Sequence, residues 1–79
     1  MSVFAKLTAR ELEVATLLAA GMPAVAVGIR LGIGYKAVET YQTNARKKLG
    51  VQSASGLTLL AVREGLISMH DDPMHDEVP

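Results

Sequence analysis

Hydrophobic and polar positions along the chain repeat at helical spacing and predict four helices. The first predicted helix covers residues 9–20, where apolar residues recur three or four positions apart. Thr8 and Glu11 have the spacing of a capping box at its start, and Gly21 is placed to end it in a left-handed conformation. These signals favour an all-α fold class.

The second predicted helix is short, and Pro23 suits its first helical position, where the missing amide costs nothing. Gly28 lies inside it and destabilises a helix by about 1 kcal/mol relative to alanine. We therefore expect Gly28 to allow a close contact between two helices. The third predicted helix covers residues 35–49, with Gly34 as its N-cap and Gly50 at its end.

The third predicted helix has two different faces. The side toward the core carries Val38, Tyr41 or Gln42, Ala45 and Leu49. The opposite side carries polar residues three or four positions apart, namely Lys36, Glu39, Thr40, Thr43 and Lys47. A narrow polar ridge flanked by cations has the shape that enters a major groove. The basic run from Arg46 to Lys48 either contacts phosphate or forms a solvated face of the helix.

The fourth predicted helix begins near Ser53 and stops before Gly65. Its inward positions are Leu57, Leu60 and Ala61, and Leu66 and Ile67 are expected to fold back onto the core. Its outward positions are Thr58, Leu59 and Val62, which we predict to form a dimer interface. The alternative is that Leu59 and Val62 pack against Phe4 or the chain's own N-terminal segment.

The length and composition limit the classes of protein to which this chain can belong. A chain of 79 residues forms one domain near the lower size limit for independent folding. It contains no cysteine, so neither disulfides nor thiolate metal sites supplement its core. No apolar run approaches the roughly 20 residues that span a bilayer, and the N-terminus lacks the long apolar stretch of a signal peptide. We expect a cytoplasmic protein without membrane contact.

The charge is unevenly distributed, although the formal net charge is zero. All eight basic residues precede Glu64, and only four of the eight acidic residues lie at or before that position, which leaves this part at +4. We predict that residues 1–67 form the folded domain and that residues 68–79 form a flexible acidic tail. Such a tail could fold over the basic third helix and compete with DNA.

Catalytic patterns are missing from the part expected to be rigid. It contains no Ser-His-Asp, Cys-His or paired-carboxylate arrangement, and no P-loop or dinucleotide glycine pattern. In the tail, residues 70–72 and 75–76 have the types of side chain that bind metals, but a solvated tail is the favoured interpretation. We predict no enzyme activity, catalytic residue, metal site, cofactor or small-molecule ligand.

Several motifs resemble those of the LuxR/GerE/FixJ-type DNA-binding domain of bacterial regulators. Residues 7–14 read LTARELEV, similar to LTxRExEV, and residues 36–41 read KAVETY, similar to KTVxxH. Asn44 and the sequence KKLGV at residues 47–51 continue a match that covers 61 of the 79 residues, from Leu7 to Ile67. The resemblance implies a four-helix domain whose second and third helices form a helix-turn-helix. It also implies that the polar ridge contacts DNA and that the fourth helix pairs two copies.

The chain departs from this family pattern in its second helix. Residues 23–28 read PAVAVG where the family has a polar cap followed by Asn-Lys-Glu-Ile-Ala. Val25 stands where a phosphate-facing lysine is common, Ala37 replaces a threonine, and Tyr41 replaces the usual histidine. These changes lower the expected DNA affinity. Most family members also carry another domain ahead of this one. Because only six residues precede the match and the chain ends in an acidic tail, we expect a stand-alone regulator rather than an excised domain.

Two functions follow from these observations. The first is a transcription regulator that binds double-stranded DNA as a homodimer and is associated with the nucleoid. The alternative is a protein-interaction module, an antagonist that forms a heterodimer with a larger related regulator through the fourth helix and blocks its DNA binding.

Overall fold

The computed structural model describes residues 2–68, which fold into a short 3-10 helix followed by four α-helices. The elements are η1 (Val3–Lys6), α1 (Ala9–Ala19), α2 (Ala24–Leu31), α3 (Tyr35–Leu49) and α4 (Ala54–Arg63). No strand occurs within residues 2–68, so the all-α prediction is confirmed. Apart from Ser68, the predicted acidic tail lies outside the described residues.

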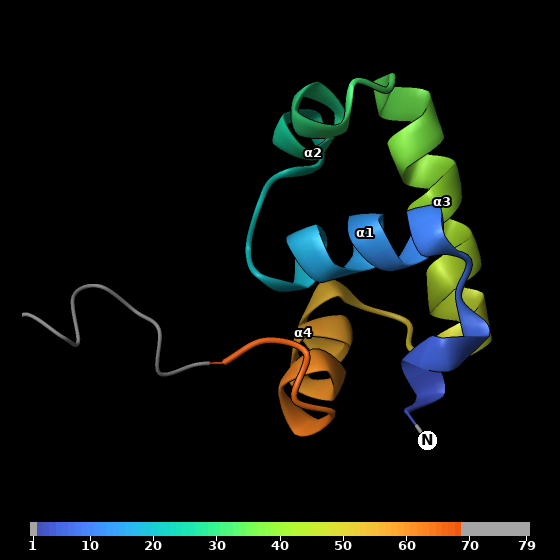
Figure 1. The fold of residues 1–79 in the computed structure, drawn as a ribbon, viewed down its shortest axis with the longest axis vertical. Coiled ribbons are helices and arrows are strands. Elements are labelled where there is room, and N and C mark those ends of the chain that lie inside the picture. The colour runs from blue at the N-terminus through green and yellow to red at the C-terminus, as the bar shows by residue number, and fades with distance from the viewer. Residues whose placement is uncertain (1, 69–79) are drawn as a thin grey trace, which may run out of the picture.

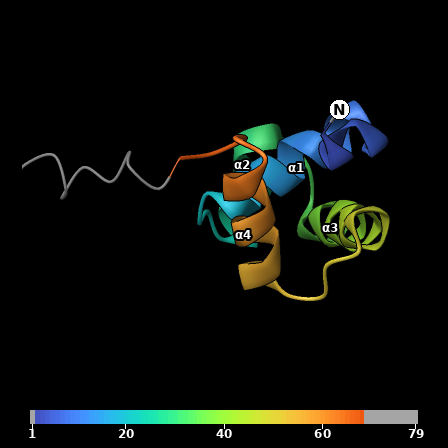
Figure 2. The same ribbon diagram turned by 90° about the horizontal axis from the view of Figure 1, so that it is seen from below.

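The helices are arranged around α1. Figure 1 shows α3 along one side of the domain, α2 near the start of α3, and α1 across the middle. α1 contacts both α3 and α4, whereas α2 packs mainly against α3. Figure 2 shows α3 end-on, with its outer side turned away from the other helices. One long side of α3 is therefore free to meet a partner.

The core consists of two clusters on different sides of α1. Val14 of α1 packs with Val27 of α2 and Val38 of α3, and all three are fully buried. The second cluster is centred on Phe4, Ala15, Ala19, Ala45, Leu57 and Ala61. Its members come from η1, α1, α3 and α4, and Leu66 and Ile67 pack against it as predicted. η1 was not predicted, and its contribution to the core is the buried ring of Phe4.

The predicted capping box fixes the start of α1. The Thr8 hydroxyl accepts a hydrogen bond from the Glu11 amide at 3.2 Å, and the Glu11 carboxylate accepts one from the Thr8 amide at 2.9 Å. Glu11 is buried, and Lys48 Nζ at the end of α3 also donates to it at 2.7 Å. The hydrogen bond from Lys48, followed by that from Thr8, lowers the pKa of Glu11 below its ordinary value of 4.5.

The turn between α2 and α3 explains the glycine inside α2. A Cβ atom on Gly28 would lie 2.8 Å from the Ile33 carbonyl oxygen and 3.5 Å from Val38 Cγ2. Gly28 thus makes a tight contact, but with the backbone of the turn rather than with a second helix, because Val38 of α3 lies only at ordinary van der Waals distance. At the start of α2, the prediction that Pro23 occupies the first helical position was wrong. Pro23 is the N-cap, with an extended backbone at a ψ of 150°, and its carbonyl accepts a hydrogen bond from the Val27 amide.

Candidate nucleic-acid interface

The outer face of α3 carries the residues that the sequence predicted as a ridge. All of them are exposed: Lys36, Glu39, Thr40, Thr43 and Lys47. Val38 and Ala45, which belong to the opposite side of the helix, are buried against α1 and its neighbours. The two-faced pattern of α3 is therefore confirmed by the exposure of the ridge and the burial of the opposite side.

The middle of the ridge is slightly hollowed. Five side chains line this depression of about 270 Å³, namely Lys36, Glu39, Thr40, Thr43 and Asn44. Asn44 was not among the predicted contact residues, although it lies four positions after Thr40 and so follows the same spacing. Its amide carries both a donor and an acceptor, the combination that pairs with the major-groove edge of adenine.

Hydrogen bonds within α3 limit what two ridge residues can offer. The Thr40 hydroxyl donates to the Lys36 carbonyl at 3.1 Å, which leaves the Thr40 oxygen as an acceptor and its methyl group for apolar contact. Glu39 accepts a hydrogen bond from the Tyr35 hydroxyl one turn earlier, and this bond, helped by the carboxylate charge, raises the pKa of Tyr35 above 10.0. Glu39 is therefore partly engaged within its own helix.

The three basic residues at the end of α3 have different surroundings. Lys47 is exposed and makes no ion pair within residues 2–68. Lys48 is held by Glu11, and Arg46 is half-buried with its Nε atom buried and without a hydrogen-bond partner. Successive helical residues point about 100° apart, so a basic run does not form one surface. The exposed side chain of Lys47 is therefore available for the predicted phosphate contact, whereas Lys48 has a structural role.

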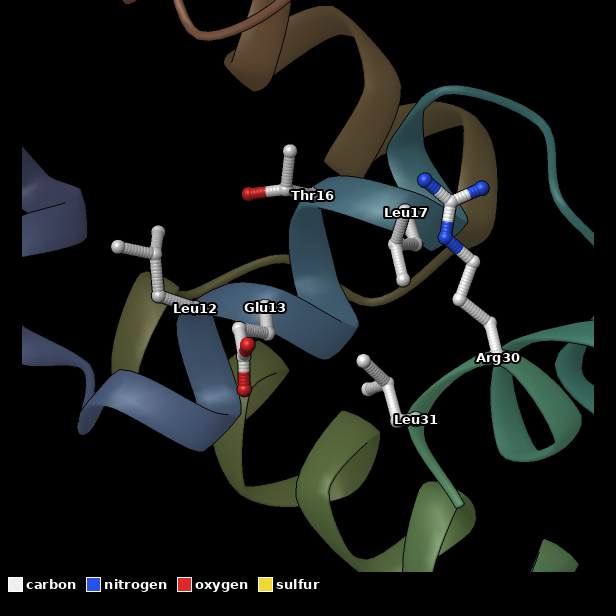
Figure 3. Close-up of a pocket in the computed structure, with 6 residues that line it drawn as sticks. All are labelled: Leu12, Glu13, Thr16, Leu17, Arg30 and Leu31. Carbon is white, nitrogen blue, oxygen red and sulfur yellow. The ribbon is translucent and has the colours of Figure 1, made fainter. Parts of the chain in front are cut away.

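α2 presents an apolar outer surface beside this ridge. Val25 and Ile29, one turn apart, are 60% and 78% exposed. A groove of about 360 Å³ separates α2 from α1, and its lining residues are Leu12, Glu13, Thr16, Leu17, Arg30 and Leu31. Figure 3 shows the Arg30 side chain extending along this groove toward the part of α1 that carries Leu17. Arg30 is thus the single cation that α2 supplies.

The predicted dimer residues on α4 differ in their surroundings. Leu59 is 66% exposed, and Val62 is half-buried; neither belongs to the apolar cluster around Phe4. Thr58 does not face away as expected. Its hydroxyl donates to the Ala19 carbonyl at 3.1 Å, because that carbonyl ends α1 and has no partner within its own helix.

Within residues 2–68 no group of three or more His, Asp or Glu side chains is arranged to hold a metal ion. The histidine and aspartate residues at positions 70–76 lie outside the described residues. None of the helices in the described part is long and apolar enough to cross a membrane.

Comparison with known proteins identifies the family. Residues 5–61 match the family described as bacterial regulatory proteins, luxR family. The chain belongs to the luxR family. The match includes the capping box of α1, the helix-turn-helix formed by α2 and α3, and most of α4. The resemblance carried by the LTARELEV and KAVETY motifs is thereby confirmed.

Two curated relatives of this luxR-family chain are named as transcriptional regulators. It is 36% identical over 62 residues to the transcriptional regulatory protein MctR of Rhizobium johnstonii, a match covering 78% of this chain and 29% of that protein. It is 41% identical over 61 residues to the transcriptional activator protein ExaE of Pseudomonas putida, covering 77% and 28% respectively. The match spans less than a third of either relative's length. No solved structure matches the chain at a significant level.

Proposed function

We propose that this luxR-family chain is a DNA-binding transcriptional regulator whose α3 enters the major groove. The observation that carries the proposal is the exposed ridge of α3, opposite the buried Val38 and Ala45. Membership of the luxR family and the printed names of the two relatives support it. Location on the nucleoid would follow from DNA binding.

The order of side chains along the ridge suits a DNA groove. Lys36 and Lys47 lie at its two ends, eleven positions apart, which corresponds to about 16 Å along the helix axis. Both can neutralise phosphates. Between them the hydroxyl groups of Thr40 and Thr43 and the amide of Asn44 are short enough to reach base edges. The cations would therefore position the helix, and the three polar residues would select the sequence.

A salt-series titration against duplex DNA tests the proposal. Lys36→Ala and Lys47→Ala should each weaken binding to every sequence and lower the salt slope by about 1, because each removes one phosphate contact. Asn44→Ala should instead reduce the preference among sequences. Arg63→Ala is the matched control, since Arg63 is an exposed cation on α4. Ridge variants that behave like Arg63→Ala would contradict the assignment.

We further propose that two copies pair through α4. Leu59 is a large apolar side chain left mostly exposed, and Val62 lies three positions later on the same helix. Residues 2–68 carry eight basic and four acidic side chains, an excess of four positive charges. Pairing would double this excess on DNA and present two α3 ridges.

Mass measurement in solution tests this pairing. Leu59→Asp should convert dimers to monomers, because it places a charge where apolar surface would be buried. Gln52→Asp adds the same charge at an exposed polar position before α4 and should leave the mass unchanged. A wild-type chain that is monomeric both free and on DNA would overturn the dimer.

The apolar outer surface of α2 favours a second candidate, the antagonist that pairs with a larger related regulator. Val25 and Ile29 weaken any DNA contact that α2 could add. This function predicts that the chain fails to bind DNA even at low salt, yet removes a full-length relative from its operator. Leu59→Asp should abolish that removal if pairing uses α4.

A further inference from the structure

A second hollow lies on a different flank of α3 from the ridge. It has a volume of about 410 Å³ and is surrounded by the end of α1, the start of α2, the middle of α3 and the start of α4. The polar part of its lining consists of Gln42 and Arg46 of α3 and Ser55 and Thr58 of α4, and Pro23 and Ala24 line it at the start of α2. Arg46 follows Lys36 by ten positions and so points about 80° around the helix from it.

Arg46 is the one charged residue in this lining, and its surroundings are unusual. Its Nε atom is buried without a hydrogen-bond partner, and Arg46 forms no ion pair within residues 2–68. A guanidinium stays protonated and carries five N–H donors, so a buried donor without an acceptor is unfavourable. No carboxylate lines the hollow to supply that acceptor. The Nε atom itself is closed to solvent, but Arg46 lines the hollow and its terminal N–H groups form no hydrogen bond within residues 2–68, so these groups can bind an anion from outside the domain.

Other donors face the same space. The side-chain amide of Gln42, one turn before Arg46, lines the hollow and makes no hydrogen bond to the residues 2–68 that the structure describes. α2 begins at Ala24, and its N-cap Pro23 provides no side-chain cap, so the first amides of α2 have no partner within the helix. At the start of α4, Ser53 caps only the Gly56 amide, and the Ser55 amide has no partner in its helix. Both helix starts also bring partial positive charge.

We propose that this hollow binds a phosphate group, with Arg46 as the main ligand and Gln42 and Ser55 as additional donors. A phosphate has several acceptor oxygens, which matches donors that converge from α2, α3 and α4. The Thr58 hydroxyl is not counted, because it already donates to the Ala19 carbonyl. The group can come from the DNA backbone beside the groove that holds the ridge, or from a free phosphate compound. Only the first source rests on the proposed function.

Titration of the full chain with inorganic phosphate, followed by NMR of the backbone amides, tests the site. Phosphate should shift the amide signals of Ala24 and Ser55, whereas chloride at equal ionic strength should not. Arg46→Met keeps the length of the side chain but removes the charge, and should weaken phosphate binding at least tenfold. Arg63→Met removes an exposed cation on α4 that does not line the hollow, and should leave phosphate binding unchanged. Wild-type spectra without these shifts, or equal shifts in both variants, would overturn the site.

Duplex titrations with the same variants identify the source of the phosphate. If the DNA backbone supplies it, Arg46→Met also lowers duplex affinity and its salt slope by about 1. If duplex binding is unchanged while inorganic phosphate binding is lost, the ligand is a free phosphate compound. A chain that binds phosphate through Arg46 but binds no DNA supports this site and refutes the proposed function. If Arg46→Met does not fold, Gln42→Leu provides the same comparison, because it removes the side-chain amide without changing the charge.

Discussion

Gly28 connects the packing of the helix-turn-helix to its stability, and its replacement by alanine tests that connection. The added Cβ would lie 2.8 Å from the Ile33 carbonyl oxygen, closer than real Cβ atoms come to such an oxygen. That carbonyl is part of a tight turn, because the Ile33 amide donates to the Gly28 carbonyl at 2.9 Å. Either this hydrogen bond lengthens, or α3 moves away from α2.

The expected magnitude is the balance of two effects. Alanine is a better helix former than glycine by about 1 kcal/mol. Overpacking against fixed backbone costs about 1–3 kcal/mol. We expect Gly28→Ala to lower the free energy of unfolding by about 1 kcal/mol, which in a domain of this size lowers Tm by about 4–8 °C.

Thermal and urea unfolding of Gly28→Ala and Gly56→Ala form a matched test. A Cβ on Gly56 would lie 3.2 Å from the Ser53 Oγ atom, which belongs to an exposed side chain, and 3.7 Å from Val51 Cβ. Gly56→Ala should therefore be neutral or stabilising by up to about 1 kcal/mol. If Gly28→Ala is as stable as the wild type, or if both variants lose equal stability, the contact with Ile33 does not determine the residue at position 28.

Two further predictions concern contacts between distant segments. Folding lowers the pKa of Glu11, so the ionised Glu11 carboxylate stabilises the folded protein above pH 4.5. This stabilisation is lost as the pH falls through the lowered pKa of Glu11 in the folded state. Glu11→Gln should therefore be less stable than the wild type near neutral pH, with a difference that shrinks in acid; denaturant unfolding at several pH values measures this, with exposed Glu13→Gln as the control. Thr58→Val should lower the free energy of unfolding by about 1 kcal/mol, because the Ala19 carbonyl loses its donor. Thr16→Val, at a threonine without a side-chain hydrogen bond, should change the urea midpoint less.

The sequence alone determined the features that depend on neighbours along the chain. A helix places residues three or four positions apart on one face, so the ridge from Lys36 to Lys47 could be read from spacing. The capping box of Thr8 and Glu11 is equally local, because both partners lie within one turn. These signals also carried the family resemblance. They predicted the helices and placed the candidate DNA-contacting side chains on the exposed side of α3.

Only the tertiary structure decided how residues far apart in the sequence combine. Lys48 and Glu11 are 37 positions apart, and Thr58 and Ala19 are 39 apart; helical periodicity gives the direction of each side chain but not what lies opposite. The same limit applies to Arg46, which looks like its lysine neighbours in the sequence. Packing of α1, α2 and α4 around α3 buries the Nε atom of Arg46. It also pairs Lys48 with Glu11 and leaves Lys47 exposed. Three adjacent cations thus receive three different environments because each points toward a different neighbour.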